Sequence, residues 1–262
     1  MEINFKNKVI LITGGLGNLG KRIVKGFCEA DAKKIILLDK NDFSESDKDF
    51  FSSNISHIDF INIDLEEFKK YSSKVIDKVN EYEGVDILIN NAAFVGTSNL
   101  DGWNVNYENQ TLETWNRAMN LNVAIANELI KALIPLFRST DSIASILNIA
   151  SIYGSVPPRW DLYEGLNINN PAAYGASKSA LINLTKYLAT YLGPKGIRVN
   201  SLSPGGIFLD QDAEFVKRYS SHVPLNRMAD FDEVAKIAIL LSHNDFSYLN
   251  GQNIIFDGGF SL

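Results

Sequence analysis

The chain switches repeatedly between two hydrophobic patterns, and this alternation is what most constrains its fold. Short, largely apolar runs occur at Lys8–Thr13, Lys34–Leu38, Ile58–Ile63, Asp86–Asn90, Ser145–Ala150, Arg198–Ser203 and Asn253–Phe256. Amphipathic stretches with helical spacing lie between them, at Leu19–Ala30, Glu66–Tyr82, Leu112–Phe137, Pro171–Leu192 and Asp232–Leu241. Strands that alternate with helices predict an α/β fold, with one doubly wound parallel sheet of about seven strands and helices on both faces.

Composition narrows the class of protein. The 262 residues show no linker, repeat or low-complexity tract, so we expect a single domain over residues 1–262. No apolar run approaches the roughly 20 residues that cross a bilayer, and a net charge of −6 offers no footprint for nucleic acid. A lone cysteine, Cys28, fits a reducing compartment, so we expect a cytoplasmic protein with neither a membrane nor a nucleic-acid partner. Cys28 and the three scattered histidines predict no metal site.

Three segments are candidates for substrate loops, at about 92–111, 152–170 and 205–230, and the first two resist assignment to a helix or a strand. The first two are long, polar and aromatic, and each follows a predicted strand. Ligands of open α/β folds bind at the carboxyl ends of the strands. We therefore expect all three segments to be substrate loops.

A glycine-rich turn joins the first predicted strand to the first predicted helix. It contains Gly14, Gly17 and Gly20, with Asn18 and Leu19 between the last two. Glycines at such a turn let a pyrophosphate approach the amides of the helix N-terminus. In this context the turn predicts a dinucleotide site rather than a plain turn.

Asp39 ends the second predicted strand, nineteen residues after Gly20. A carboxylate at this position is expected to bind the adenosine ribose hydroxyls. It would repel a 2′-phosphate some 4 Å away by about 4 kcal/mol at an effective dielectric constant near 20. We therefore predict NAD as the cofactor in preference to NADP, although Asp39 as an ordinary turn or helix-capping residue stays an open alternative.

Polar side chains from four places in the chain are expected to converge on the same crevice. Tyr174 and Lys178 lie four residues apart in a predicted helix and so share a face. Ser151 and the pair Asn90 and Asn91 follow the ends of two predicted strands, and Asn122 lies in the long helix between them. Such convergence is hard to explain by packing.

With these residues the chain resembles the short-chain dehydrogenase/reductase family, of the classical type with a Rossmann sheet, over nearly its whole length. The matched elements include the glycine turn, Asp64, Asn90-Asn91-Ala92, Asn122, Ser151, the Tyr174/Lys178 pair, Pro204-Gly205 and Asp257-Gly258-Gly259. The resemblance implies that Tyr174 is the general acid/base, Ser151 polarises a substrate carbonyl, Lys178 binds the nicotinamide ribose and Asn122 supports a proton relay. It also implies a homo-oligomer, either a dimer or a tetramer, and further cofactor contacts from Asp64, Leu65, Asn90, Asn91, Ala92, Pro204, Gly205 and Ile207.

The expected chemistry requires a tyrosine that gives up its proton more readily than usual. A free phenol has a pKa near 10, and a nearby cation lowers a pKa by about 1–3 units. We therefore expect Lys178 and the oxidised nicotinamide to lower the pKa of Tyr174.

The sequence departs from the family pattern at three positions. Asn18 stands where glycine is usual, and we expect it to tolerate a left-handed backbone. Ala93 replaces a glycine, and Leu209 replaces a threonine on the nicotinamide side. The last two changes put the geometry beside the nicotinamide in question.

Ser151 and Tyr174 are 23 positions apart, and the segment between them is rich in aromatic and polar residues. Aromatic rings stack on sugars and arginine binds phosphate, which makes Trp103, Arg159, Trp160 and Tyr163 candidates for substrate binding. Subunit packing or a rim that closes the crevice is an equal alternative. The segment around Tyr163-Glu164-Gly165 also resembles oxidoreductases of flagellin-modification and surface-sugar pathways.

We therefore expect an NAD-dependent oxidoreductase that acts on a secondary alcohol or ketone, with a small-molecule substrate related to a sugar of bacterial surface-glycan or flagellin-glycan biosynthesis. Two alternatives stay open. One is a 3-oxoacyl thioester reductase of fatty-acid metabolism, which usually needs NADPH and a basic surface. The other is a nucleotide-binding homologue without catalysis, against which the set of Asn122, Ser151, Tyr174 and Lys178 argues.

Overall fold

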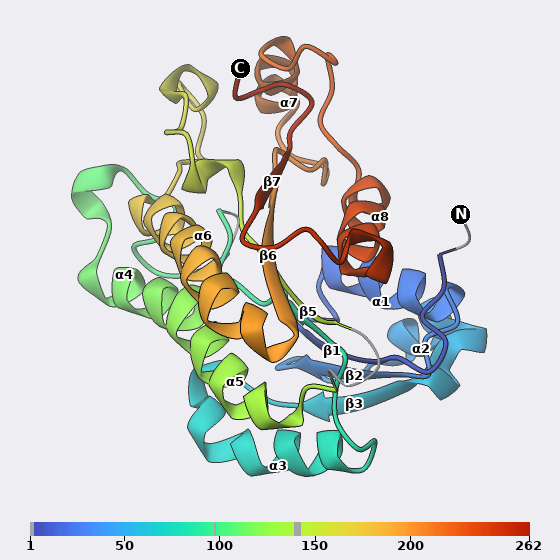
Figure 1. The fold of residues 1–262 in the computed structure, drawn as a ribbon. Coiled ribbons are helices and arrows are strands. Elements are labelled where there is room, and N and C mark those ends of the chain that lie inside the picture. Colours follow the sequence, from blue (N-terminus) through green and yellow to red (C-terminus); the bar gives the residue numbers. More distant parts are fainter. Residues whose placement is uncertain (1–2, 97, 139–142) are drawn as a thin grey trace.

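The computed structural model describes residues 3–96, 98–138 and 143–262, so residue 97 of the 92–111 segment and the chain's first two residues lie outside it. All strands of the sheet are parallel, in the order β3-β2-β1-β4-β5-β6-β7 (Figure 1). The predicted seven-stranded doubly wound sheet is confirmed. Its strands are β1 (Val9–Thr13), β2 (Lys34–Asp39), β3 (Ile58–Asn62), β4 (Ile87–Asn90), β5 (Ala144–Ile149), β6 (Ile197–Pro204) and β7 (Asn253–Phe256).

Helices cover both faces of the sheet (Figure 1). One face carries α1 (Asn18–Glu29) and α8 (Phe231–Ser242), which pack against each other. The opposite face carries α3 (Phe68–Asn80), α4 (Leu112–Met119), α5 (Ala126–Leu133) and α6 (Ala172–Leu192). Apolar residues on both sides of the central strands fill the two cores that this arrangement requires.

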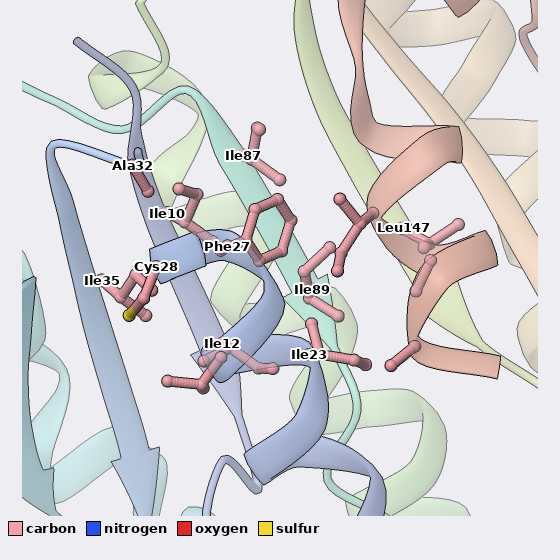
Figure 2. Close-up of a cluster of buried hydrophobic side chains, with 14 of the residues drawn as sticks. Ile10, Ile12, Ile23, Phe27, Cys28, Ala32, Ile35, Ile87, Ile89 and Leu147 are labelled. Carbon is pink, nitrogen blue, oxygen red and sulfur yellow. The ribbon is translucent and has the colours of Figure 1, made fainter. Parts of the chain in front are cut away.

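Figure 2 shows one of these cores, where Ile23 and Phe27 of α1 meet side chains of the strands. Ile10 and Ile12 point to this core, and Val9 and Leu11 of the same strand point to the other. All five residues of β1 are buried. Such a strand holds the turn that follows it in a fixed position, which matters for the site below.

Two helices were not expected from the sequence. The short helix α2 (Glu45–Phe51) begins with a capping box, in which Ser44 and Asp47 satisfy each other's backbone amides. Helix α7 (Ala213–Ser221) lies inside the 205–230 segment, which was predicted as a loop. Asp212 caps α7, and its Tyr219 is buried, so a short amphipathic pattern was missed there.

The predicted helix Leu112–Phe137 is a continuous run of helical turns whose type changes along its length. Helix α4 runs into a π-helical stretch, Asn120–Ile125, then into α5 and a 3₁₀ turn, Ile134–Leu136. π-helical turns are rare and occur frequently at functional sites. Here the stretch contains Asn122.

The 152–170 segment, α7 and the C-terminus lie toward one end of the molecule (Figure 1). Across the described ranges, no helix is long and apolar enough to span a bilayer.

Candidate active site

The glycine turn after β1 is too tight for side chains. Gly14 has a φ of +64°, and a Cβ there would lie 2.9 Å from the Cα of Ala92. A Cβ on Gly20 would lie 2.1 Å from the carbonyl oxygen of Gly14. These two glycines therefore let the chain reverse and let α1 pack directly on the turn.

The N-terminus of α1 is open to an anion. Gly17 is its N-cap and supplies no side-chain cap, and Gly17 and Asn18 are exposed. The first amides of a helix have no partner within the helix, and its dipole favours negative charge there. These residues fit a pyrophosphate. Asn18 is the first helical residue, so the expected left-handed backbone is not found and its side chain causes no conflict.

Asp39 lies beside this turn and is buried. Its carboxylate accepts hydrogen bonds from the amides of Leu16 at 2.9 Å and Asn41 at 3.0 Å. Each oxygen holds one of these bonds, and a carboxylate oxygen accepts about two. Asp39 therefore braces the turn and keeps acceptor capacity for ribose hydroxyls.

The residues after β4 hold the turn from the other side. The Asn91 side chain donates to the carbonyl oxygens of Thr13 and Gly14, at 3.1 and 2.9 Å. The Thr13 hydroxyl in turn accepts from the amides of Asn91 and Ala92. Thr13 was missed by sequence reasoning, although it directly precedes Gly14 of the glycine turn. Asn91 and Ala92 thus act on the cofactor site by positioning the glycine turn.

The other predicted cofactor residues line the same edge. Asn90 is buried and donates to Asn148 at 2.8 Å, while its own Oδ1 has no partner among the residues that the structure describes. Asp64 is exposed and caps the turn that contains the buried Leu65. Pro204 ends β6, followed by the half-buried Gly205 and Ile207. The exposed Asp64 and the half-buried residues leave surface for a bound dinucleotide.

The structure brings Ser151, Tyr174 and Lys178 together at the end of β5. Lys178 is buried, its Nζ lies 5.8 Å from the centre of the Tyr174 ring, and it donates to the carbonyl oxygen of Ile149 at 2.8 Å. The Ser151 hydroxyl hydrogen-bonds the Tyr174 phenol. Ser151 follows β5 and caps a 3₁₀ turn, Ile152–Gly154, that packs on α6.

Burial dominates the electrostatics of this group. It raises the pKa of Tyr174, and the hydrogen bond from Ser151 opposes that rise only in part. Burial also lowers the pKa of Lys178 to about 7. In the protein by itself the cost of removing a phenolate from water therefore prevails. The expected lowering of the Tyr174 pKa also needs the charge of the oxidised nicotinamide, so it stays a prediction for the protein with cofactor bound.

Asn122 reaches the same site from the π-helical stretch. It is buried, accepts from the amide of Phe94 at 2.8 Å and donates to Ser177 at 2.9 Å. The Ser177 hydroxyl donates onward to the carbonyl oxygen of Tyr174 at 2.8 Å. Ser177, just before Lys178, was missed by sequence reasoning and connects Asn122 to the backbone of Tyr174.

The four predicted substrate residues divide in two. Trp103 was expected as a stacking surface, and this is wrong because its side chain is only 1% exposed and packs with Phe94, Ala118 and Ala173. Trp160 is 58% exposed, Arg159 is exposed beside Asp161, and Tyr163 is half-buried. Only the last three present surface to a ligand. Periodicity could not separate Trp103 from Trp160, because both lie in irregular segments.

The arrangement can move a proton at a carbon–oxygen bond. A nicotinamide dinucleotide bound along this edge would supply hydride transfer. Ser151 and Tyr174 would both donate to an oxygen that gains charge, and Tyr174 would exchange its proton with that oxygen. No cluster of histidine, cysteine or carboxylate side chains that could hold a metal occurs among the residues that the structure describes.

The sequence of this chain is similar to those of known oxidoreductases. Residues 15–261 match the family model described as Enoyl-(Acyl carrier protein) reductase. The chain is 29% identical to 7alpha-hydroxysteroid dehydrogenase of Bacteroides fragilis, with 98% of this chain and 96% of that protein covered.

Two solved structures are similar in both fold and sequence. A short chain dehydrogenase from Leptospira borgpetersenii with bound NAD⁺ has a TM-score of 0.85 at 31% identity, covering 99% of this chain and 94% of that one. The Pseudomonas aeruginosa RhlG/NADP active-site complex has a TM-score of 0.83 at 27% identity, covering 100% and 99%. The chain therefore belongs to the short-chain dehydrogenase/reductase family and is an NAD(P)-dependent oxidoreductase that acts on CH–OH groups.

Proposed function

We propose that the protein uses NAD to interconvert a secondary alcohol and a ketone on a polyhydroxylated substrate, such as a sugar derivative of bacterial surface-glycan or flagellin-glycan biosynthesis. The observation that carries the reaction class is the group of Ser151, Tyr174 and Lys178 at the end of β5, in which Ser151 and Lys178 are buried and Tyr174 is half-buried. Tyr174 exchanges the proton, Ser151 holds the reacting oxygen, and Lys178 binds the nicotinamide ribose.

Asp39 supports NAD as the physiological cofactor. Its carboxylate is fixed by the amides of Leu16 and Asn41 and is held against the glycine turn. A phosphate on the adenosine ribose would meet this fixed negative charge, which cannot rotate away without breaking both bonds. The relatives by themselves leave the choice open, because one neighbouring structure holds NAD⁺ and another NADP.

The polar rim of the crevice supports a substrate with several oxygens. Segments 92–111 and 152–170 are joined by side-chain amides: Asn169 donates to Asn106 at 3.1 Å, and Gln110 donates to the carbonyl oxygen of Asn170 at 3.5 Å. The exposed Arg159 and Trp160 lie in the same rim. Amides, an arginine and a flat ring suit hydroxyl groups and a sugar face better than an acyl chain.

A reductase of acyl thioesters is the second candidate, because the matching family model is described as an Enoyl-(Acyl carrier protein) reductase. The exposed apolar side chains of Trp160, Phe208 and Leu225 give an acyl chain some apolar surface. The net charge of −6 is unfavourable for an acidic carrier protein.

An activity screen separates the two candidates. The purified protein is assayed with NAD(H) and NADP(H) against sugar-derived ketones and alcohols, simple secondary alcohols and 3-oxoacyl thioesters. We expect the highest kcat/KM with NAD(H) and a polyhydroxylated compound. Turnover of thioesters with NADPH, and none of polyhydroxylated compounds, would overturn the proposal.

A further inference from the structure

Two tyrosines beside the catalytic group form a hydrogen-bonded pair that the reaction itself does not use. The hydroxyls of Tyr153 and Tyr163 are 3.1 Å apart, and either can be the donor. Both side chains are half-buried, so the pair is neither locked in the core nor fully in solvent.

Hydrogen bonds connect the pair to Ser151 and to Asn170, a residue close to Tyr174 in the chain. Tyr153 lies two residues after Ser151, and its amide donates to the Ser151 hydroxyl at 3.2 Å. Asn170 lies four residues before Tyr174, and its Nδ2 donates to the Tyr163 hydroxyl at 3.1 Å. Tyr163 is near enough to Tyr174 to contribute to the raised pKa of that phenol.

The two tyrosines have one more O–H donor than the hydrogen bond between them uses. Asn170 Nδ2 is a donor only, so the Tyr163 oxygen is its acceptor. One O–H of the two tyrosines serves the bond between them. The other O–H has no acceptor in the part of the chain that the structure describes, whichever tyrosine carries it.

We propose that the Tyr153–Tyr163 pair, oriented by Asn170, is a substrate subsite that donates one hydrogen bond to a second oxygen atom of the substrate, next to the carbon that reacts. The inference rests on the proposed function and deepens it. Ligands that supply such an oxygen are α-hydroxy ketones and vicinal diols, the units of which sugars are built. A substrate with a lone ketone leaves the donor unpaired at a half-buried place, which costs affinity.

The test compares two ketones that differ by one hydroxyl, cyclohexanone and 2-hydroxycyclohexanone. Each is assayed for reduction by NADH and titrated against the enzyme–NADH complex by NADH fluorescence. We expect the wild-type protein to favour the hydroxyketone by about five- to tenfold, the size of one neutral hydrogen bond. Tyr163→Phe should lose this preference, because its activity and affinity toward the hydroxyketone should fall by more than those toward cyclohexanone.

A second variant tests the proton count rather than the shape. Asn170→Asp keeps the size of the side chain but converts the donor into an acceptor, so Tyr163 donates to the new carboxylate and Tyr153 donates to Tyr163. No O–H is then left for the substrate. We expect this variant to lose the preference for the hydroxyketone although both phenols remain, while the exposed Tyr187→Phe keeps it.

The outcomes separate this inference from the proposed function. Equal handling of the two ketones by the wild-type protein, in turnover or in titration, overturns the subsite. Equal losses on both ketones in Tyr163→Phe also overturn it, because they show a purely structural role. A preference seen in titration, with no NADH oxidised for either ketone, supports the subsite and instead contradicts the proposed reaction.

Discussion

At the scale of single residues, burial makes the charged forms of the catalytic group costly. Lys178 has a pKa of about 7 in the folded protein and an ordinary pKa of 10.5. Between these values the unfolded chain holds a proton that the folded chain lacks, so the free energy of unfolding rises with pH. Below pH 7 the lysine is charged in both states and its desolvation penalty is fully present. A group suited to catalysis therefore weakens the fold near neutral pH.

Lys178→Met should show this penalty directly. The variant lacks the buried charge. Its free energy of unfolding should therefore exceed that of the wild type by the largest amount near pH 6. The difference should shrink toward pH 9, by at most about 1.4 kcal/mol per pH unit. Urea unfolding at both pH values measures it, with the exposed Lys186→Met as control. A difference that is the same at both pH values would contradict the low pKa.

Tyr174→Phe tests the proton exchange. Removing the hydroxyl should reduce turnover by about 100-fold or more, the usual contribution of a general acid or base. Binding of NAD should stay within about twofold, because the phenol oxygen serves the reacting bond rather than the dinucleotide. Steady-state assays and NADH fluorescence titration measure the two effects. Full turnover in this variant would remove Tyr174 from the reaction.

Asp39→Asn tests the choice of cofactor. The amide keeps an acceptor for the turn but removes the negative charge, whose repulsion of a 2′-phosphate is about 4 kcal/mol at an effective dielectric constant of 20. We expect kcat/KM with NADP, divided by that with NAD, to rise at least tenfold. The exposed Asp42→Asn, three residues further along, should leave the ratio unchanged. An unchanged ratio in Asp39→Asn would show that the turn's shape, not this charge, sets the preference.

At the scale of elements, α7 is fastened to the 152–170 segment. Arg218 donates to the carbonyl oxygens of Asp161 and Glu164, at 3.2 and 2.6 Å, and His222 pairs with Asp161 at 2.7 Å. Tyr163 packs on Phe215, with ring centres 5.6 Å apart. Two of the three predicted substrate segments are therefore joined to each other through α7.

The fastening predicts a substrate-specific effect of Arg218→Ala. Losing two hydrogen bonds to backbone carbonyls should loosen α7 over the 152–170 segment and raise KM for the substrate about tenfold. KM for NAD should stay unchanged, because the glycine turn lies elsewhere on the sheet edge. Lys217→Ala, a neighbouring exposed residue on the same helix, is the matched control. A parallel rise in both KM values would show a general loss of structure instead.

Features that depend on residues close together in the sequence were predicted, and those that depend on residues far apart were not. The sheet, the glycine turn and the Tyr174/Lys178 pair depend on local periodicity or fixed spacing, and these were predicted. The bond from Asn122 to Ser177 joins positions 55 residues apart, so no local pattern reports it. The raised pKa of Tyr174 depends on burial by several segments at once, which a sequence does not show.

At the scale of the whole molecule, the crevice rim is held by a small core of its own. Trp103 fills that core together with Phe94 and Ala118, and Tyr174 packs against it. The indole Nε1 also donates to the carbonyl oxygen of Val95 at 2.8 Å. An irregular segment thereby becomes part of the rigid structure around Tyr174, in contrast to the exposed Trp160.

The two tryptophans therefore predict opposite outcomes. Trp103→Ala should lower the free energy of unfolding by about 3–5 kcal/mol, because it leaves a large cavity. Trp160→Ala should change it by no more than about 0.5 kcal/mol, as is usual for exposed positions, and should act on substrate KM instead. Urea unfolding and steady-state kinetics on the same preparations compare them. A small stability loss in Trp103→Ala would mean that the segment closes over the gap, and that the rim is not held by this core.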